Sequence, residues 1–100
     1  MPYYNAQETW EPIAGSQQKL TVSDSVVQLS GTSAACVLVY VTVEGQAARI
    51  TFDGSDPTGT TGHLYAAGTS EVWTKKQAAA AKFIRDGGSD AIVHATEFEA

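Results

Sequence analysis

The chain alternates short apolar runs with short polar turns. The clearest run covers residues 36–43, where β-branched and aromatic residues dominate and every second position from 37 to 43 is valine. Such alternation predicts a strand with one face in the core. Residues 48–53 alternate in the same way after a turn at 44–47, so we expect these two strands to form a hairpin.

Further strand candidates follow the same pattern along the chain. They lie at residues 19–22, 26–29, 63–66, 71–74, 82–85 and 91–98. Short segments rich in Ser, Asp and Gly separate them, as expected of turns. About eight short strands at this spacing are typical of an antiparallel sandwich or barrel. We therefore predict an all-β protein, a small antiparallel β-sandwich that is jelly-roll-like.

One stretch has the composition of a helix. Residues 75–82 include a run of four alanines, which have high helix propensity. The stretch is too short to form a helix in isolation. Two interpretations stay open: a single helical turn crosses one end of the sandwich, or the alanines begin the strand that contains Phe83.

The first 17 residues follow neither pattern. Their large apolar side chains show no regular period, and two prolines interrupt any strand. We therefore divide the chain into an extended N-terminal arm, residues 1–17, and a single β-sandwich domain, residues 18–100. The arm is too apolar for a solvated linker, so it should lie on its own domain or on another chain. We predict that four of its side chains bind a partner: Tyr3, Tyr4, Trp10 and Ile13.

Composition excludes several classes of function. The 100 residues fit one domain, and 11 acidic against 6 basic side chains leave no basic surface for nucleic acid. The longest uncharged apolar stretch, residues 34–43, is too short to cross a membrane, and residues 1–5 do not resemble a secretory signal. The single cysteine, Cys36, can form neither an intrachain disulfide nor a two-cysteine zinc site, and we expect it to be buried. We therefore expect neither nucleic acid nor a membrane as a partner.

The densest polar feature lies at residues 53–58. Two carboxylates and a serine in four positions could offer oxygen ligands to a hard cation, but the spacing of an EF-hand loop is absent. Asp, Gly and Pro are also the residues that a turn requires, because Asp side chains bond to nearby backbone donors. We therefore predict a structural turn, with no metal and no cofactor, at Asp53, Gly54, Asp56 and Pro57.

No motif of a catalytic site is present in the sequence. The Gly-x-Ser segments at 31–33 and 68–70 lack the closing glycine of a nucleophile elbow. The glycine-rich segment 58–63 lacks the lysine of a phosphate-binding loop. Glu97 and Glu99 alternate with Phe98, and we expect both carboxylates on a solvated face. We expect no enzyme activity.

A longer pattern resembles a known group of proteins. It comprises Ala-Arg-Ile-Thr-Phe-Asp-Gly-Ser-Asp-Pro-Thr at 48–58, Gly-His-Leu at 62–64, Gly68, Lys-Phe-Ile-Arg at 82–85 and a closing alternating strand. In order and spacing over residues 35–99 it resembles small virion proteins of tailed bacteriophages. The resemblance implies a capsid decoration or cement protein, made in the bacterial cytoplasm, that forms a homo-oligomer on the virion and binds the major capsid protein or other virion proteins. A head–tail connector and a tail or receptor-binding component are the alternatives.

A second resemblance covers fewer residues. The segment 52–58 is similar to a turn in small sandwich domains appended to bacterial glycoside hydrolases, which implies an accessory carbohydrate-binding module. Coplanar exposed rings of Trp73, Tyr65 and Tyr40 on one sheet face would favour this alternative, but we expect Trp73 in the core. The low charge and the aromatic arm favour a subunit of a symmetric array.

Overall fold

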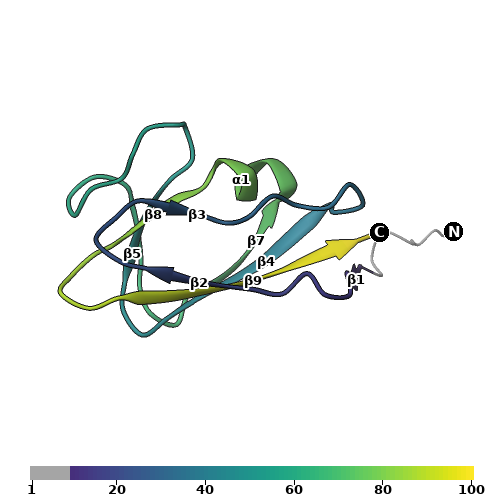
Figure 1. Ribbon diagram of the computed structural model, residues 1–100, viewed down its shortest axis with the longest axis horizontal. Helices are drawn as coiled ribbons and strands as arrows, with labels where there is room; N and C mark the ends of the chain where they lie inside the picture. Colours follow the sequence, from purple (N-terminus) through teal and green to yellow (C-terminus); the bar gives the residue numbers. More distant parts are fainter. Residues whose placement is uncertain (1–9) are drawn as a thin grey trace, which may run out of the picture.

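Two antiparallel sheets form the structure, a computed structural model that describes residues 10–100 (Figure 1). Sheet A consists of β1 (Glu11–Pro12), β2 (Gln18–Val22), β4 (Leu38–Glu44), β7 (Ser70–Thr74) and β9 (Ala91–Glu99). Sheet B consists of β3 (Val27–Gln28), β5 (Ala48–Thr51), β6 (His63–Tyr65) and β8 (Lys82–Arg85). The predicted all-β sandwich is therefore confirmed.

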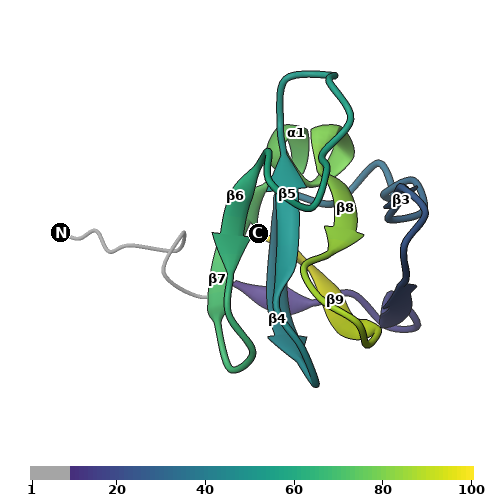
Figure 2. The same ribbon diagram turned by 90° about the vertical axis from the view of Figure 1, so that its left-hand side faces the viewer.

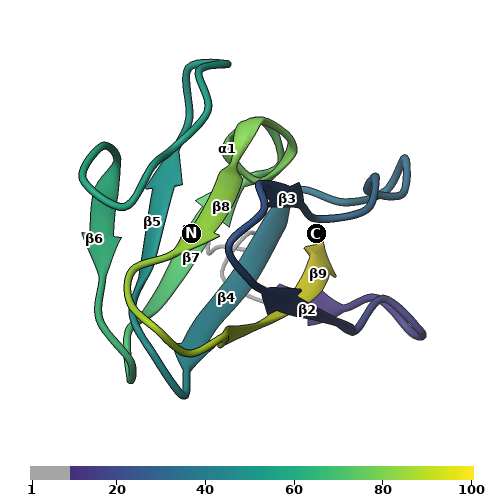
Figure 3. The ribbon, with the colours of Figure 1, turned by 60° about the vertical axis from the view of Figure 1, so that its left-hand side comes forward.

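The order of the strands is that of a jelly roll. In sheet A, β2 and β1 both pair with one side of β9, and β4 and β7 follow on its other side. In sheet B the order is β3-β8-β5-β6. From β2 onward the chain changes sheet at every connection except that between β5 and β6. Figure 3 shows one such crossing, the connection from β2 to β3. Double-sheet folds of this kind limit exposed strand edges.

The expectation that residues 36–43 and 48–53 form a hairpin is wrong. β4 pairs with β7 and β9 in sheet A, whereas β5 lies between β6 and β8 in sheet B (Figure 2). The turn at 44–47 therefore carries the chain from one sheet to the other. Two apolar faces bury more surface when they face each other across a core than when they lie side by side. The valines of β4 accordingly pack in the same buried cluster as Ala48 and Ile50.

Aromatic rings fill one end of the core around Trp73. Its side chain is 2 % exposed, as expected for a core residue, and its indole N–H donates to the Glu71 carboxylate at 2.8 Å. The Phe52 ring meets it edge-on at 5.2 Å between centroids, and the Phe83 ring lies at 6.0 Å. Phe83 belongs to sheet B and Trp73 to sheet A, so this contact holds the two sheets together.

The helical interpretation of the alanine run is confirmed. Helix α1 (Lys75–Ala80) carries the chain from β7 to β8 at one end of the sandwich (Figure 2). Thr74 caps it: its hydroxyl accepts from the Gln77 backbone N–H at 3.1 Å, and the Gln77 side chain accepts from the Thr74 N–H. Ala78 and Ala81 are buried, so small side chains allow close packing at this crossing.

The expectation of a solvated Glu97 is wrong. Glu97 faces inward in the same phase as Val93 and Ala95, and it is 6 % exposed. Its carboxylate accepts from the backbone N–H and the hydroxyl of Ser33, at 3.0 and 2.9 Å. A buried carboxylate is tolerated because these donors replace water. Burial and the Glu97 charge raise the pKa of the Cys36 thiol, which is buried as expected.

We predict that Gly62 cannot be replaced without loss of stability. It adopts φ +123°, and an added Cβ would lie 3.2 and 3.3 Å from the backbone N and O of Ile50. Gly62→Ala should lower the free energy of unfolding by about 1–3 kcal/mol, measured by urea denaturation. Gly59→Ala is the matched control, because a Cβ there meets open space. Equal stability of the two variants would contradict this role.

Candidate functional site

The described part of the N-terminal arm follows sheet A. Glu11 and Pro12 pair with the end of β9, and the Ile13 N–H donates to the Glu97 carbonyl at 2.8 Å. The Ile13 side chain is partly buried and packs against the core of its own domain. The proposed partner-binding residues Tyr3 and Tyr4 lie outside the described residues.

Trp10 lies elsewhere, on the outer face of sheet A. Together with four strand residues it lines a groove of about 170 Å³, which we call the apolar groove. Its residues are Trp10, Leu38, Tyr40, Val72 and Phe98. Tyr40 stands opposite Val72 across β4 and β7, and Leu38 stands opposite Phe98 across β4 and β9. The groove thus lies at the end of sheet A where β9 finishes and β1 begins. Figure 1 shows this end of the sheet.

Three of the five groove side chains are well exposed for apolar groups, and Leu38 and Phe98 are partly buried. Val72 is 59 % exposed, Tyr40 is 43 % exposed and Trp10 is 36 % exposed. A contiguous exposed apolar surface is typical of an interaction site, whereas single exposed apolar residues are ordinary. The groove offers no charged group, so it fits apolar or aromatic side chains of a partner.

The same face of sheet A becomes polar toward its other end. Thr42 and Glu44 continue the outward phase of β4, and the Glu44 carboxylate lies 3.6 Å from the His94 ring. The Thr96 hydroxyl donates to the Gln17 side chain at 2.6 Å. The apolar character is therefore confined to one end of the sheet and is not a general property of its surface.

Most of this groove is not evident from the sequence. The sequence marks Trp10 as a partner contact and Tyr40 as a candidate sugar-stacking ring, but it assigns no contact to Leu38, Val72 or Phe98. The available signal is that three strands carry large apolar residues in the phase opposite to the core. Which strands are neighbours depends on the pairing of β4 with β7 and β9, and alternation alone does not contain that pairing.

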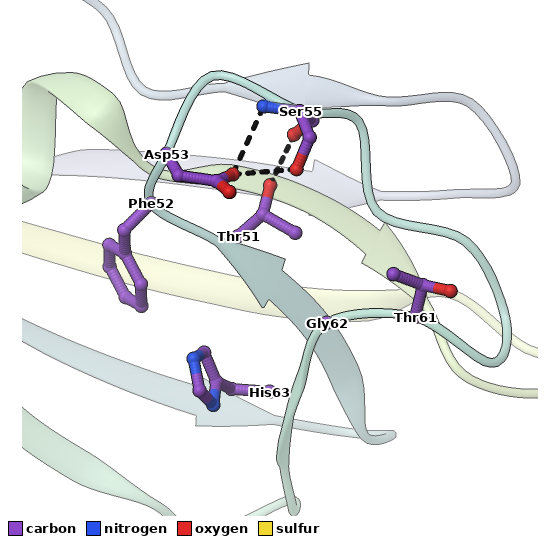
Figure 4. A pocket seen from close by; sticks show the side chains of 7 residues that line it. All are labelled: Thr51, Phe52, Asp53, Ser55, Thr61, Gly62 and His63. Carbon is purple, nitrogen blue, oxygen red and sulfur yellow. Dashed lines mark hydrogen bonds between the residues drawn. The ribbon is translucent and has the colours of Figure 1, made fainter.

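The loop after β5 contains the residues predicted to form a structural turn (Figure 4). The Asp53 carboxylate accepts from the Ser55 backbone N–H at 3.1 Å and from the Ser55 hydroxyl at 2.6 Å. These hydrogen bonds lower the pKa of Asp53. Gly54 follows with φ +92°, a conformation that favours glycine. Asp53 therefore makes the side-chain-to-backbone bonds expected of a turn.

Asp56 contributes to the same loop differently. Its carboxylate pairs with the Lys82 ammonium at 3.0 Å, and the same ammonium donates to the Gly54 carbonyl at 3.0 Å. Lys82 belongs to β8, so this contact ties the loop to sheet B. Pro57 is fully buried beneath the loop. The expected backbone bonding by Asp56 is thus replaced by an ion pair.

A hollow of about 460 Å³, with both polar and apolar walls, lies beside this loop. It is lined by Thr51, Phe52, Asp53, Ser55, Thr61, Gly62 and His63. Figure 4 shows Asp53 and Ser55 bonded to each other, and the Thr51 hydroxyl donates to the Ser55 carbonyl. These polar groups stabilise the loop itself, and the Phe52 ring also packs on Trp73. The apolar groove is therefore the stronger candidate for contact with a partner.

We predict that Asp53 matters more to stability than Asp56. Asp53→Ala removes two hydrogen bonds, whereas Asp56→Ala removes one exposed ion pair, so Asp53→Ala should melt at the lower temperature. The pKa of Asp53 lies below its usual 3.8 in the folded state, so its stabilisation is complete above about pH 4 and is lost at lower pH. The gap between wild type and Asp53→Ala, measured by thermal unfolding, should close as the pH falls. A gap that widens in acid, or a melting temperature raised by added calcium, would contradict the structural-turn role.

Residues 10–100 offer neither a metal-binding cluster nor a membrane-spanning helix. This part of the chain contains no group of three or more His, Cys, Asp or Glu side chains placed to hold a metal ion. None of its helices is long and apolar enough to cross a membrane. Comparison of the chain with protein-family models, with curated proteins and with solved structures finds no match.

Proposed function

We propose that this protein is a virion structural protein of a tailed bacteriophage, a capsid decoration protein that stabilises the head by bridging capsid subunits. The observation that carries the proposal is the apolar groove, with its exposed Val72 and Tyr40. Trp10, a residue of the N-terminal arm, forms part of the wall of this groove. A subunit that is stabilised in an array needs such a surface, because buried apolar area drives most protein association.

The fold suits this role without specifying it. Jelly rolls occur in viral capsids and also in lectins, so the fold by itself favours neither class. The low content of charged residues, 17 %, favours a surface that neighbouring subunits cover rather than one that is fully solvated. The proposed mechanism is mechanical: each copy buries surface across a junction between capsid subunits, so that more contacts must break before the shell opens.

The rival carbohydrate-binding role finds little support in the aromatic residues. Sugar stacking across one face would need Trp73, Tyr65 and Tyr40 exposed together. Trp73 is buried. The Tyr65 ring meets the Trp73 ring edge-on, and the Tyr65 hydroxyl donates to the Glu71 carboxylate at 2.9 Å. Burial and that hydrogen bond raise the pKa of Tyr65 to about 12. Tyr40 lies alone of the three on the outer face of sheet A.

We predict that antibody labelling of purified virions decorates the head in a regular array. The readout is electron microscopy of immunogold-labelled particles. Capsids assembled without the protein should bind it in a sedimentation assay and should then open at a higher temperature. Label confined to the neck or tail would favour the connector or receptor-binding alternative, and virions that carry no label would overturn the proposal.

A further inference from the structure

We propose that the apolar groove is the docking site for residues 1–9 of a second copy of this chain, with Tyr3 and Tyr4 as the anchoring side chains. The inference names the partner of the surface on which the proposed function is built, and it rests on that surface being used for assembly. It predicts that the purified protein associates through its arms, whatever the particle to which it belongs.

The course of the chain favours a second copy over the same copy. Glu11 pairs with Glu99, the last residue of β9, so the backbone read toward the N-terminus leaves sheet A at that end. Trp10, the next residue, already forms part of the groove wall. A segment that continues in this direction moves away from its own domain and would have to reverse at once to enter its own groove. Nine extended residues span up to about 30 Å, enough to reach a neighbouring domain.

The chemistry of the segment matches the groove. Its sequence is Met-Pro-Tyr-Tyr-Asn-Ala-Gln-Glu-Thr, in which residues 1–7 carry no charged side chain. The groove is lined by apolar and aromatic side chains, and its volume of about 170 Å³ is below the roughly 300–1,000 Å³ of typical small-molecule sites. A groove of this size fits one or two side chains of an extended segment. Tyrosine suits such a place because it buries a large ring and keeps its hydroxyl at the wet edge.

The geometry also allows the exchange to be mutual. Each copy has its groove at the end of sheet A where Trp10 and β1 lie, beside the C-terminal end of β9; Figure 1 shows this end of the sheet. Two copies related by a two-fold axis at that end would each donate one arm and receive one. Contacts of this self-complementary kind are those of closed dimers, and exchange of an identical segment is a common route to them.

The test measures the mass of the full-length protein by sedimentation velocity over a wide range of concentration. The variants are Tyr3→Ser/Tyr4→Ser, which removes the anchors, and Val72→Lys, which places a charge in the groove. Leu64→Lys is the matched control, because Leu64 is 54 % exposed on sheet B, outside the groove. Thermal unfolding of each variant confirms that the fold is retained.

We expect wild type and Leu64→Lys to form the same oligomer. Tyr3→Ser/Tyr4→Ser and Val72→Lys should each weaken association by about tenfold or more, the loss expected when an anchoring contact is removed. A synthetic peptide of residues 1–9 should bind Tyr3→Ser/Tyr4→Ser, measured by Trp10 fluorescence or calorimetry. It should bind much more weakly once Val72→Lys is added to that variant.

Three results would overturn the proposal. A wild type that stays monomeric at every concentration excludes exchange, and peptide binding only after the tyrosines are removed would then assign the groove to the chain's own arm. Association that depends on Val72 but not on the tyrosines would mean that the sheet faces pack directly. Association that depends on the tyrosines but not on Val72 would place the arm elsewhere. None of these results bears on the labelling of virions, which tests the proposed function separately.

Discussion

The contact between the two sheets is the interaction on which the rest of the structure depends. Within residues 10–100, β5 and β6 are the one pair of paired strands that also follow each other in the chain without another strand between them. Every other pairing joins segments that are distant in sequence, so neither sheet is held together locally. The rings of Trp73 and Phe83 and the valines of β4 provide the shared core that brings these distant segments together. A topology so rich in long-range contacts folds more slowly than one built from hairpins.

Polar side chains secure the segments that the sheets leave free. Glu97 lies at the end of β9, beyond the apolar core, and its backbone and carboxylate hold both the arm near Ile13 and the segment at Ser33. Lys82 does the same for the long loop between β5 and β6, by bonding to Asp56 and Gly54. In both places one charged side chain forms hydrogen bonds with two groups of a segment that does not pair with a strand at that point. Loss of one partner would leave donors or acceptors without a bond, which costs more than the bond contributes in isolation.

The apolar groove arises from the same arrangement. β9 is the longest strand, and its last residues extend to where β1 begins and the outer face of sheet A is apolar. Phe98 and Leu38 meet there because β9 pairs with β4, and Val72 joins them because β4 pairs with β7. An exposed apolar surface of this kind lowers the solubility of a protein until a partner covers it. The proposed roles in assembly follow from this surface and not from any reactive group.

Alternation along the chain was enough to identify the all-β class, most of the strands and, for residues 36–43 and 48–53, the side of the strand that faces the core. The apolar surroundings of Trp73 and Cys36 in the sequence placed both residues inside, and the Asp, Gly and Pro residues at 53–57 identified the loop in which Asp53 forms a turn. These features are local: they depend on the two-residue period of a strand and on bonds between near neighbours. Strand pairing, the burial of Glu97 and the existence of the apolar groove were decided only by the tertiary structure. Each of them depends on which distant segments lie side by side, and alternation states which face of a strand is buried without stating what covers it.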